Sequence, residues 1–306
     1  MASQRDVRTK ISSVKNIQKI TRAMEMVAAA RLRRAEQRIE ALRPYAGAIR
    51  RMTAQAAVAA GAEAMRLPLL TAHESENSVG LLLVTGDRGL AGAFNSQIIR
   101  AGVRRASELS DEGRATSWYA TGRRGVSSVS FRGNELSGSY TGFSDRPAFA
   151  DARDVAGDLM TAYVDGRIDR VELIYNRYIS PLTQTVASEA LLPLSHAIVD
   201  GHRSEESGEE QAAGDDAHAA RGAVEYEPDP ETILARLVPD YVEISIYRAL
   251  AESAAGFFGA QMTAMRSASE NAGEIITQYT LQMNRARQAE ITQEIMEVVA
   301  GAEGLA

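Results

Sequence analysis

One glycine-containing segment is the strongest candidate for ligand chemistry in this sequence. GDRGLAG, from Gly86 to Gly92, follows a short apolar run and precedes an amphipathic stretch, which is where phosphates bind in dinucleotide-binding folds. Its glycines are spaced three and three residues apart, unlike the G-x-G-x-x-G fingerprint, and no Gly-Lys-Ser/Thr follows as in a P-loop. We interpret the segment first as a structural turn that starts a helix, and second as a ligand loop.

The other candidates for catalytic or metal chemistry are weaker. Ser188, His196 and Asp200 lie close in sequence but lack the nucleophile elbow of a hydrolase. The chain has no cysteine, and its four histidines show no HxH or HxxxH spacing, so we expect no metal site. A run of carboxylates falls in a polar stretch, where the fixed geometry of acid–base catalysis is not expected. It consists of Glu205, Glu206, Glu209, Glu210, Asp215 and Asp216. We therefore expect no catalytic residue and no cofactor.

The formal net charge of −6 conceals two oppositely charged segments. Residues 1–52 hold thirteen Lys/Arg and four Asp/Glu, a local charge of +9. Residues 200–231 hold two Arg and eleven Asp/Glu, a local charge of −9, and within them 200–227 is predicted to be an acidic surface insertion. The basic segment is a candidate for nucleic-acid binding. No aromatic residue is interleaved with its charges over residues 1–42, however, so an acidic protein is the better candidate partner.

Two long helices are predicted at the ends of the chain. In the N-terminal segment, residues 1–64, apolar or small side chains recur about every 3.5 residues, the period of a left-handed coiled coil. Pro44 is expected to interrupt or kink this helix. The C-terminal segment, residues 228–306, shows helical spacing beyond Pro239. In the N-terminal segment about 55 residues at 1.5 Å each make a rod roughly 80 Å long, too long for a compact domain, and about 60 residues past Pro239 make one of roughly 90 Å. The N-terminal stripe comprises Val7, Ile11, Val14, Ile17, Ile20, Met24, Val27, Leu32, Ala35, Ile39 and Leu42.

The centre of the chain, residues 77–199, has the pattern of a small α/β domain. Short apolar runs that end in glycine are typical of buried parallel strands, and amphipathic stretches between them are typical of crossover helices. The alternation predicts a Rossmann-like domain with a mostly parallel sheet and a final pair of strands. The predicted strands are 80–86, 116–122, 170–179 and 183–194, and the predicted helices are 93–109 and 149–164.

Five segments together resemble the gamma subunit of the bacterial F-type rotary ATP synthase, in that family's order and over nearly the whole chain. The final segment includes Ile291, Thr292 and Glu294, followed by acidic Glu297, a pattern specific to the family. The five are KISSVKNIQKITRAMEMVAAARLRRA (10–35), GDRGLAGAFN (86–95), YEPDPETIL (226–234), AMRSASENA (264–272) and NRARQAEITQEI (284–295).

The resemblance implies an α/β protein with long helices, in which the N- and C-terminal helices form an antiparallel coiled coil beside the central Rossmann-like domain. This coiled coil would be the rotor shaft inside a ring of three alpha and three beta subunits. Its foot would contact the c ring and the epsilon subunit, near Tyr226 and Glu227. The chain would be a non-catalytic subunit of a proton-translocating ATP synthase that couples ion flow to ATP synthesis or hydrolysis.

The resemblance also implies where the shaft would meet the beta subunits. Arg287, Gln288 and Thr292 match positions that contact beta, and Glu294 lies two helical turns after Arg287 on the same stripe. Met24 matches a position that faces an acidic lever of beta. No apolar run approaches the roughly 20 residues needed to cross a bilayer, so we expect a soluble chain. The resemblance implies that this chain is held peripherally at the cytoplasmic face of the cell membrane.

Two other interpretations remain open from the sequence. A nucleotide-binding α/β enzyme with helical arms would bind a dinucleotide through the loop that contains Gly89. A free-standing coiled-coil scaffold or nucleic-acid binder would bind DNA in a salt-sensitive manner through Lys10, Lys15 and Lys19.

Overall fold

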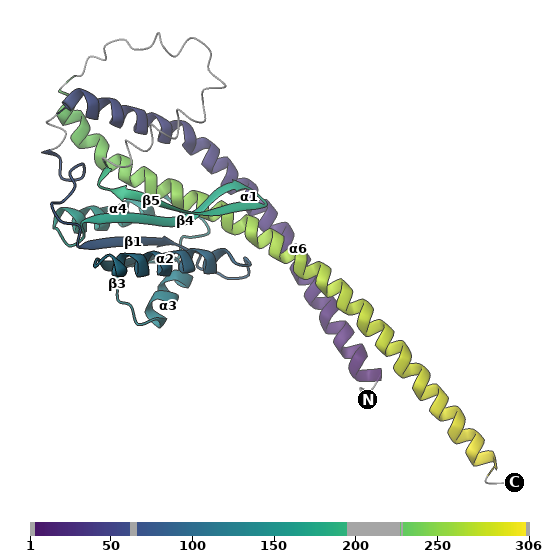
Figure 1. Cartoon of the computed structure of the whole chain (residues 1–306). Helices are drawn as coiled ribbons and strands as arrows, with labels where there is room; N and C mark the ends of the chain where they lie inside the picture. The colour runs from purple at the N-terminus through teal and green to yellow at the C-terminus, as the bar shows by residue number, and fades with distance from the viewer. Residues whose placement is uncertain (1–3, 62–65, 195–226, 228, 304–306) are drawn as a thin grey trace. The chain divides into compact units, whose positions relative to one another are not determined.

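The computed structural model describes residues 4–61, 66–194, 227 and 229–303 (Figure 1). The chain forms two compact units. The first consists of Met1–Ala30 and Gln261–Ala306, and the second is Arg31–Ala260. Helices α1 (Gln4–Ala60) and α6 (Pro230–Glu303) contribute to both units, and each helix continues through its internal proline, Pro44 or Pro239. The helix is therefore not interrupted at Pro44, so the expected interruption is wrong.

The first unit is an antiparallel pair of helices. Lys10 of α1 lies over the ring of Tyr279, 5.8 Å from its centroid. Further along α1, the Gln18 side-chain amide donates to the carbonyl of Ser269 at 3.1 Å. Since higher residue numbers on α1 meet lower numbers on α6, the two helices run in opposite directions. The predicted coiled coil of the two chain ends is confirmed.

The buried seam of α1 differs from the predicted stripe in the middle of this unit. Ile17, Ile20 and Val27 were expected to be buried, but they are 54%, 59% and 53% exposed, whereas Thr21 and Ala28 are buried. The physical reason is the phase of the repeat. Steps of four and three from Val7 lead through Ile11 and Val14 and then through positions 18, 21, 25 and 28, where polar and small residues stand. Counting the most apolar side chains instead rotates the stripe away from α6.

The polar members of the seam are tied to α6 by specific contacts. Half-buried Gln18 donates to Ser269, and the Glu25 carboxylate accepts from Arg266 Nε at 2.9 Å. Polar side chains thus occupy those seam positions of α1 at which α6 supplies a hydrogen-bond partner.

The second unit is built on one five-stranded sheet in the order β3-β2-β1-β4-β5. Strand β1 is parallel to both β2 and β4, β2 is parallel to β3, and β4 and β5 form an antiparallel pair. The mostly parallel sheet and the final pair of strands were predicted. The strands are β1 (Ser78–Val84), β2 (Ala115–Thr121), β3 (Leu136–Tyr140), β4 (Arg170–Ser180) and β5 (Thr183–Leu192).

Helices cover both faces of this sheet (Figure 1). On one face lies α2 (Phe94–Asp111), packed so closely on β1 that a Cβ at Gly102 would be 2.5 Å from Leu83. Beside it lies α3 (Arg123–Phe131). The alternate strand residues point to the other face, where α4 (Phe149–Val164) and α6 share one buried core with β1 and β4. The sheet is therefore a buried central layer.

Two elements of this unit were not predicted. Helix α3 has the sequence RRGVSSVSF, whose glycine, serines and β-branched residues are poor helix formers. Strand β3, LSGSY, is a short edge strand in which no residue is fully buried. Their local sequences do not favour a helix or a strand, and packing against β2 stabilises both elements instead.

No helix among the described residues is both long enough and apolar enough to span a bilayer.

The turn after β2 yields a prediction about stability. Gly122 has φ +81°, and a Cβ there would lie 2.2 Å from the Thr85 carbonyl oxygen. We expect Gly122→Ala to lower the free energy of unfolding by about 3 kcal/mol or more, from backbone strain together with overpacking. Gly113→Ala is the matched control, since Gly113 has φ +77° but a methyl group there would meet nothing within 4 Å. It should cost about 1–2 kcal/mol. Urea unfolding of both variants measures the difference, and equal losses would contradict the close-approach argument.

Candidate functional site

The loop from Gly86 to Gly92 is a turn held in place by side-chain hydrogen bonds. The Gly86 amide donates to Asn95 Oδ1 at 2.8 Å, and the Asn95 side-chain amide donates to the Arg88 carbonyl at 3.1 Å. Leu90 and Gly92 both have positive φ, 66° and 54°, so the chain reverses sharply before α2. Asn95 thus fastens the loop to the first turn of α2.

Asp87 in this loop joins three segments at the carboxyl edge of the sheet. Its carboxylate accepts hydrogen bonds from the backbone amides of Arg123, Gly142 and Ser144, at 3.0–3.2 Å, and from the Ser144 hydroxyl at 2.8 Å. Burial raises the pKa of Asp87, but these hydrogen bonds outweigh it and hold the pKa below its ordinary value. All of these donors belong to the chain itself, so the carboxylate has a structural role.

Helix α6 fills the crevice where a dinucleotide would bind in a Rossmann fold. Ser253 of α6 donates its hydroxyl to the Val84 carbonyl at the end of β1, at 3.3 Å. Next to it, the ring of Phe257 packs edge-on against Phe94 at a centroid distance of 5.5 Å, and a Cβ at Gly86 would lie only 3.1 Å from that ring. The remaining void is about 10 Å³, at the lower limit for one water molecule. The loop therefore supports α6 at the place where a phosphate would sit, which argues against the dinucleotide-enzyme interpretation.

The other candidates for chemistry do not form a site in the described part of the chain. Ser188 lies in β5, whereas His196, Asp200 and the carboxylates of 205–216 lie outside the described residues. Among the residues that are described, no three His, Asp or Glu side chains are placed to share a metal ion.

The far end of α6 carries four of the residues singled out from the sequence. Arg287, Gln288, Thr292 and Glu294 are all exposed, and Thr292 donates its hydroxyl to the Gln288 carbonyl of its own helix at 2.8 Å. At about 100° per residue, Glu294 returns to within about 20° of Arg287, and Thr292 lies about 40° from Gln288. The four residues therefore border one face of the helix, with a gap between the two pairs.

Apolar side chains fill that gap. Ile291, Ile295 and Val298 project between the two polar pairs at about 100° per residue, and Ile295 and Val298 are 57% and 72% exposed. Glu290 and Glu297 lie next to the Arg287–Glu294 pair, outside the gap. The polar pairs and the apolar side chains therefore share one face of the helix. We call this mixed face of residues 287–299 the α6 end face.

A second exposed surface lies on α1. Met24 is half-buried, beside Glu25. Ile17, Ile20 and Val27, which are rotated out of the seam, fall within about 80° of one another and of Met24 around the helix. This apolar α1 stripe was missed as a surface because it was assigned to the core, and a strict count of the four-three repeat would have revealed it.

The predicted foot residues are only partly covered by the structure. Glu227 is exposed, and Tyr226 lies outside the described residues.

Comparisons with known proteins give the family. A family profile described as ATP synthase matches residues 3–305. The ATP synthase gamma chain of Rubrobacter xylanophilus is 41% identical over 306 residues, which cover 100% of this chain and 99% of the relative. The gamma chain of Streptomyces avermitilis is 42% identical over 309 residues, covering 100% and 97%.

Solved structures point the same way. A chain in the central stalk and c-ring structure of Tetrahymena thermophila mitochondrial ATP synthase is 25% identical, with a TM-score of 0.58, and the match covers 82% of this chain and 99% of that one. A chain of the Euglena gracilis mitochondrial ATP synthase has a TM-score of 0.66 at 18% identity over 99% and 94%, a likeness of fold.

An α/β domain whose ligand crevice is filled by its own helix, and a helix end with exposed apolar side chains, are typical of a protein that contacts other proteins. The matches over the whole chain make this more specific. The chain belongs to the ATP synthase gamma chain family.

The role of Asp87 can be tested through the pH dependence of stability. We expect Asp87→Asn to lower the free energy of unfolding at pH 7 by about 2–3 kcal/mol, because an amide group replaces an acceptor that faces several donors. Since the folded-state pKa of Asp87 is depressed, its contribution is present above the unfolded pKa and is lost as the pH falls through the folded pKa. The difference between wild type and variant should therefore shrink below about pH 4.

The matched control for this experiment is Asp111→Asn, at the exposed C-terminal end of α2. It should change the free energy of unfolding by less than about 0.5 kcal/mol at either pH. An Asp87→Asn difference that stayed constant from pH 7 to pH 3 would refute the electrostatic explanation.

Proposed function

We propose that this chain is the central rotor shaft of an F-type ATP synthase. The helix pair of the first unit turns inside a ring of three alpha and three beta subunits. The foot contacts the c ring and the epsilon subunit, so that the chain sits peripherally at the cytoplasmic face of the cell membrane. In this role it carries torque between ion flow through the c ring and the catalytic beta subunits, and it makes or breaks no bond itself.

The α6 end face is the observation that carries the proposal. Every residue from 287 to 300 is exposed, including the large apolar side chains Ile295, Met296 and Val298. Within the described residues, the pairing with α1 does not cover them. Lys10 already lies opposite Tyr279, and α1 begins only six residues before Lys10. Since exposed apolar surface of this extent is a mark of protein contact, the enclosing ring is the natural cover.

The composition of the α6 end face suits a contact that breaks and forms again each time the shaft turns from one beta subunit to the next. We assign Arg287, Gln288, Thr292 and Glu294 to contacts with the beta subunits. Charged and amide groups at a rim exchange one partner for another, or for water, at little net cost. The apolar residues between them, by contrast, gain energy against any complementary surface. A face of this kind can bear on three beta subunits in turn without being held by one.

We assign Met24 and the α1 stripe to further contacts with beta, so that both helices of the pair take part. Lys15 and Lys19 are exposed close to the stripe in sequence, and the N-terminal 52 residues carry a local charge of +9. A basic helix with an apolar strip is complementary to an acidic, partly apolar lever of beta. The same complementarity favours protein over nucleic acid, so no nucleic-acid partner is proposed.

The proposed coupling is a shift of populations. The orientation of an asymmetric shaft stabilises one beta conformation over the others by its differential contacts, and rotation passes that preference from one beta subunit to the next. We assign residues 1–64 and 228–306 to the shaft. The α/β domain of 77–199 and the acidic insertion of 200–227, with Tyr226 and Glu227, belong to the foot.

Assembly is the first test of this function. Affinity-tagged chain, purified under mild conditions from cells that make the other subunits, should carry alpha and beta with it in a 3:3:1 ratio, because the ring encloses the helix pair. Quantitative mass spectrometry of the purified complex measures the ratio. Recovery of the tagged chain alone from the same lysate would contradict the shaft assignment.

The α6 end face can be tested separately from assembly. Deleting residues 287–306 should leave the complex assembled but weaken the coupling of ATP turnover to ion transport, because the shaft loses its bearing on beta. Arg287→Ala should reduce coupling in the same direction but less strongly. Coupling is measured as ATP-driven ion uptake divided by ATP turnover in reconstituted vesicles.

Arg285→Ala is the matched control for this face. Arg285 is exposed on the same helix, but it projects about 160° away from Arg287. It should leave coupling unchanged. Normal coupling in the truncated chain, or equal losses in the two arginine variants, would remove the role assigned to this face.

A further inference from the structure

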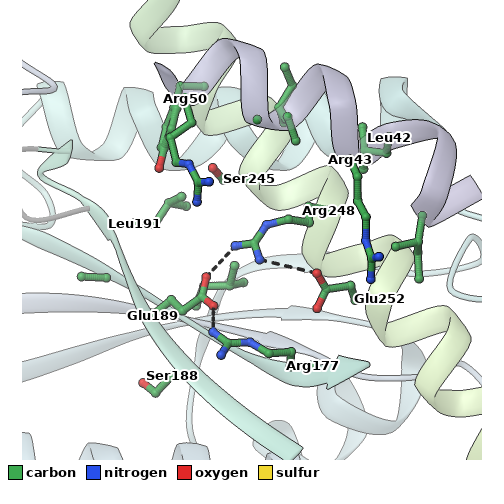
Figure 2. A pocket seen from close by; sticks show the side chains of 17 residues that line it. Leu42, Arg43, Arg50, Arg177, Ser188, Glu189, Leu191, Ser245, Arg248 and Glu252 are labelled. Atoms are coloured by element: carbon green, nitrogen blue, oxygen red, sulfur yellow. Dashed lines mark hydrogen bonds and ion pairs between the residues drawn. The ribbon is translucent and has the colours of Figure 1, made fainter. Parts of the chain in front are cut away.

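A pocket that the shaft role does not use lies within the second unit. It has a volume of about 620 Å³ and opens where α1, α6 and the antiparallel strands β4 and β5 come together (Figure 2). This volume is in the range of sites that hold small organic molecules. Its walls come from segments far apart in the sequence: Ile39 to Arg50 of α1, Tyr241 to Glu252 of α6, and β-strand residues around Leu173 and Glu189.

An ionic cluster forms the floor of the pocket. Glu189 of β5 accepts from Arg248 Nη2 of α6 at 2.7 Å and is also paired with Arg177 of β4. The Tyr175 hydroxyl donates to the same carboxylate at 2.8 Å. Both oxygens of Glu189 therefore have hydrogen-bond partners. Burial raises the pKa of Glu189, but these neighbours outweigh it, so the pKa lies below its ordinary value.

The rest of the cluster is held less tightly. Arg248 Nη1 is 3.5 Å from Glu252 Oε1 and 3.3 Å from the Tyr175 hydroxyl, both at the long limit of a hydrogen bond. The other oxygen of Glu252 is buried without a hydrogen-bond partner in the described structure. Burial raises the pKa of Glu252, although Arg248 opposes it. Arg248 Nη1 can therefore donate to a better-placed acceptor, and the unpartnered oxygen of Glu252 can accept from a donor.

Arg43 adds a further cation at the edge of the pocket. It lines the pocket from α1 (Figure 2) and is exposed, and within the described part of the chain no hydrogen bond or ion pair engages it. With Arg50, Arg177 and Arg248 against Glu189 and Glu252, the lining carries four arginines and two glutamates, a formal charge of +2.

The remaining wall is apolar. Leu42 of α1, Leu173 and Leu191 of the sheet and Ile244 of α6 line the space around the ionic cluster. A ligand that fits both parts has a charged end and an apolar body.

We propose that this pocket binds a small organic dianion, specifically a phosphate monoester with an apolar body, whose phosphate lies between Arg43 and Arg248. The charge of the lining matches a dianion better than a carboxylate, which carries a single charge. Guanidinium groups bind phosphate oxygens through paired N–H donors, and Arg248 Nη1 becomes available by leaving its long contact with Glu252. The apolar body lies along Leu42 and Leu191.

The test is calorimetric titration of the full chain with phenyl phosphate at low ionic strength. Inorganic phosphate and benzoate are titrated in parallel. Inorganic phosphate lacks the apolar body, and benzoate keeps the aromatic ring but carries a single negative charge. We expect saturable 1:1 binding of phenyl phosphate, at least tenfold tighter than either comparison probe.

Two variants and one control locate the binding. Arg43→Gln should weaken phenyl phosphate binding about tenfold or more, the loss expected for one charge-assisted contact. Ala46→Phe, which fills the pocket from α1 without changing its charge, should abolish binding. Arg33→Gln removes the same charge from an exposed position of α1 outside the pocket and should leave binding unchanged.

Three results would overturn the proposal. One is the absence of saturable binding of phenyl phosphate to the wild-type chain. Another is binding of inorganic phosphate as tight as that of phenyl phosphate, which would indicate a general anion site. The third is equal weakening by Arg33→Gln and Arg43→Gln, which would indicate attraction to the helix charge alone. Arg43 is exposed, so its variant remains informative even if Ala46→Phe fails to fold.

Discussion

The burial of α6 against the sheet is the contact on which the second unit depends. Leu234, Val238, Val242, Ile246 and Leu250 follow one another at intervals of four residues, and each is at most 3% exposed. This spacing places one continuous row of side chains on the sheet and α4, in the ridge of an i, i+4 packing. One turn later the same helix reaches the carboxyl edge, where Ser253 and Phe257 close the crevice. A packing contact between α6 and the sheet thus occupies the place where a Rossmann fold would bind its ligand.

The two units use the same helices with different kinds of contact. In the second unit, large aliphatic and aromatic side chains fill a core. In the first, the seam positions of α1 include Thr21, Gln18 and Ala28, which bury little apolar area. By the usual relation of stability to buried apolar surface, the helix pair gains less per residue than the core does. The apolar residues that would have strengthened the seam stand instead on the outside, where the proposed function needs them.

The sequence determined some of these features locally and others only through long-range contacts. The apolar runs of β1 and β4, and the alternation of β4 and β5, were sufficient to predict the sheet, because burial and period are encoded in neighbouring residues. Helix α3 and strand β3 were missed because contacts with β2 decide their structure. On α1, Ile17 and Ile20 led the prediction astray, since hydrophobicity alone does not reveal the phase of a seam whose polar members are satisfied across it. The ionic cluster of Arg177, Glu189 and Arg248 could not be foreseen, because its members lie on three different elements and only the fold brings them together.

The polar members of the seam have a mechanical consequence. If α1 slid along α6 by one turn, Gln18 would lose the Ser269 carbonyl, and Glu25 would lose Arg266. An aliphatic seam tolerates such slippage, since one methyl group replaces another, whereas a polar seam has one axial alignment in which its groups are satisfied. The polar contacts thereby fix the axial alignment of the helix pair, while the apolar α1 stripe stays exposed.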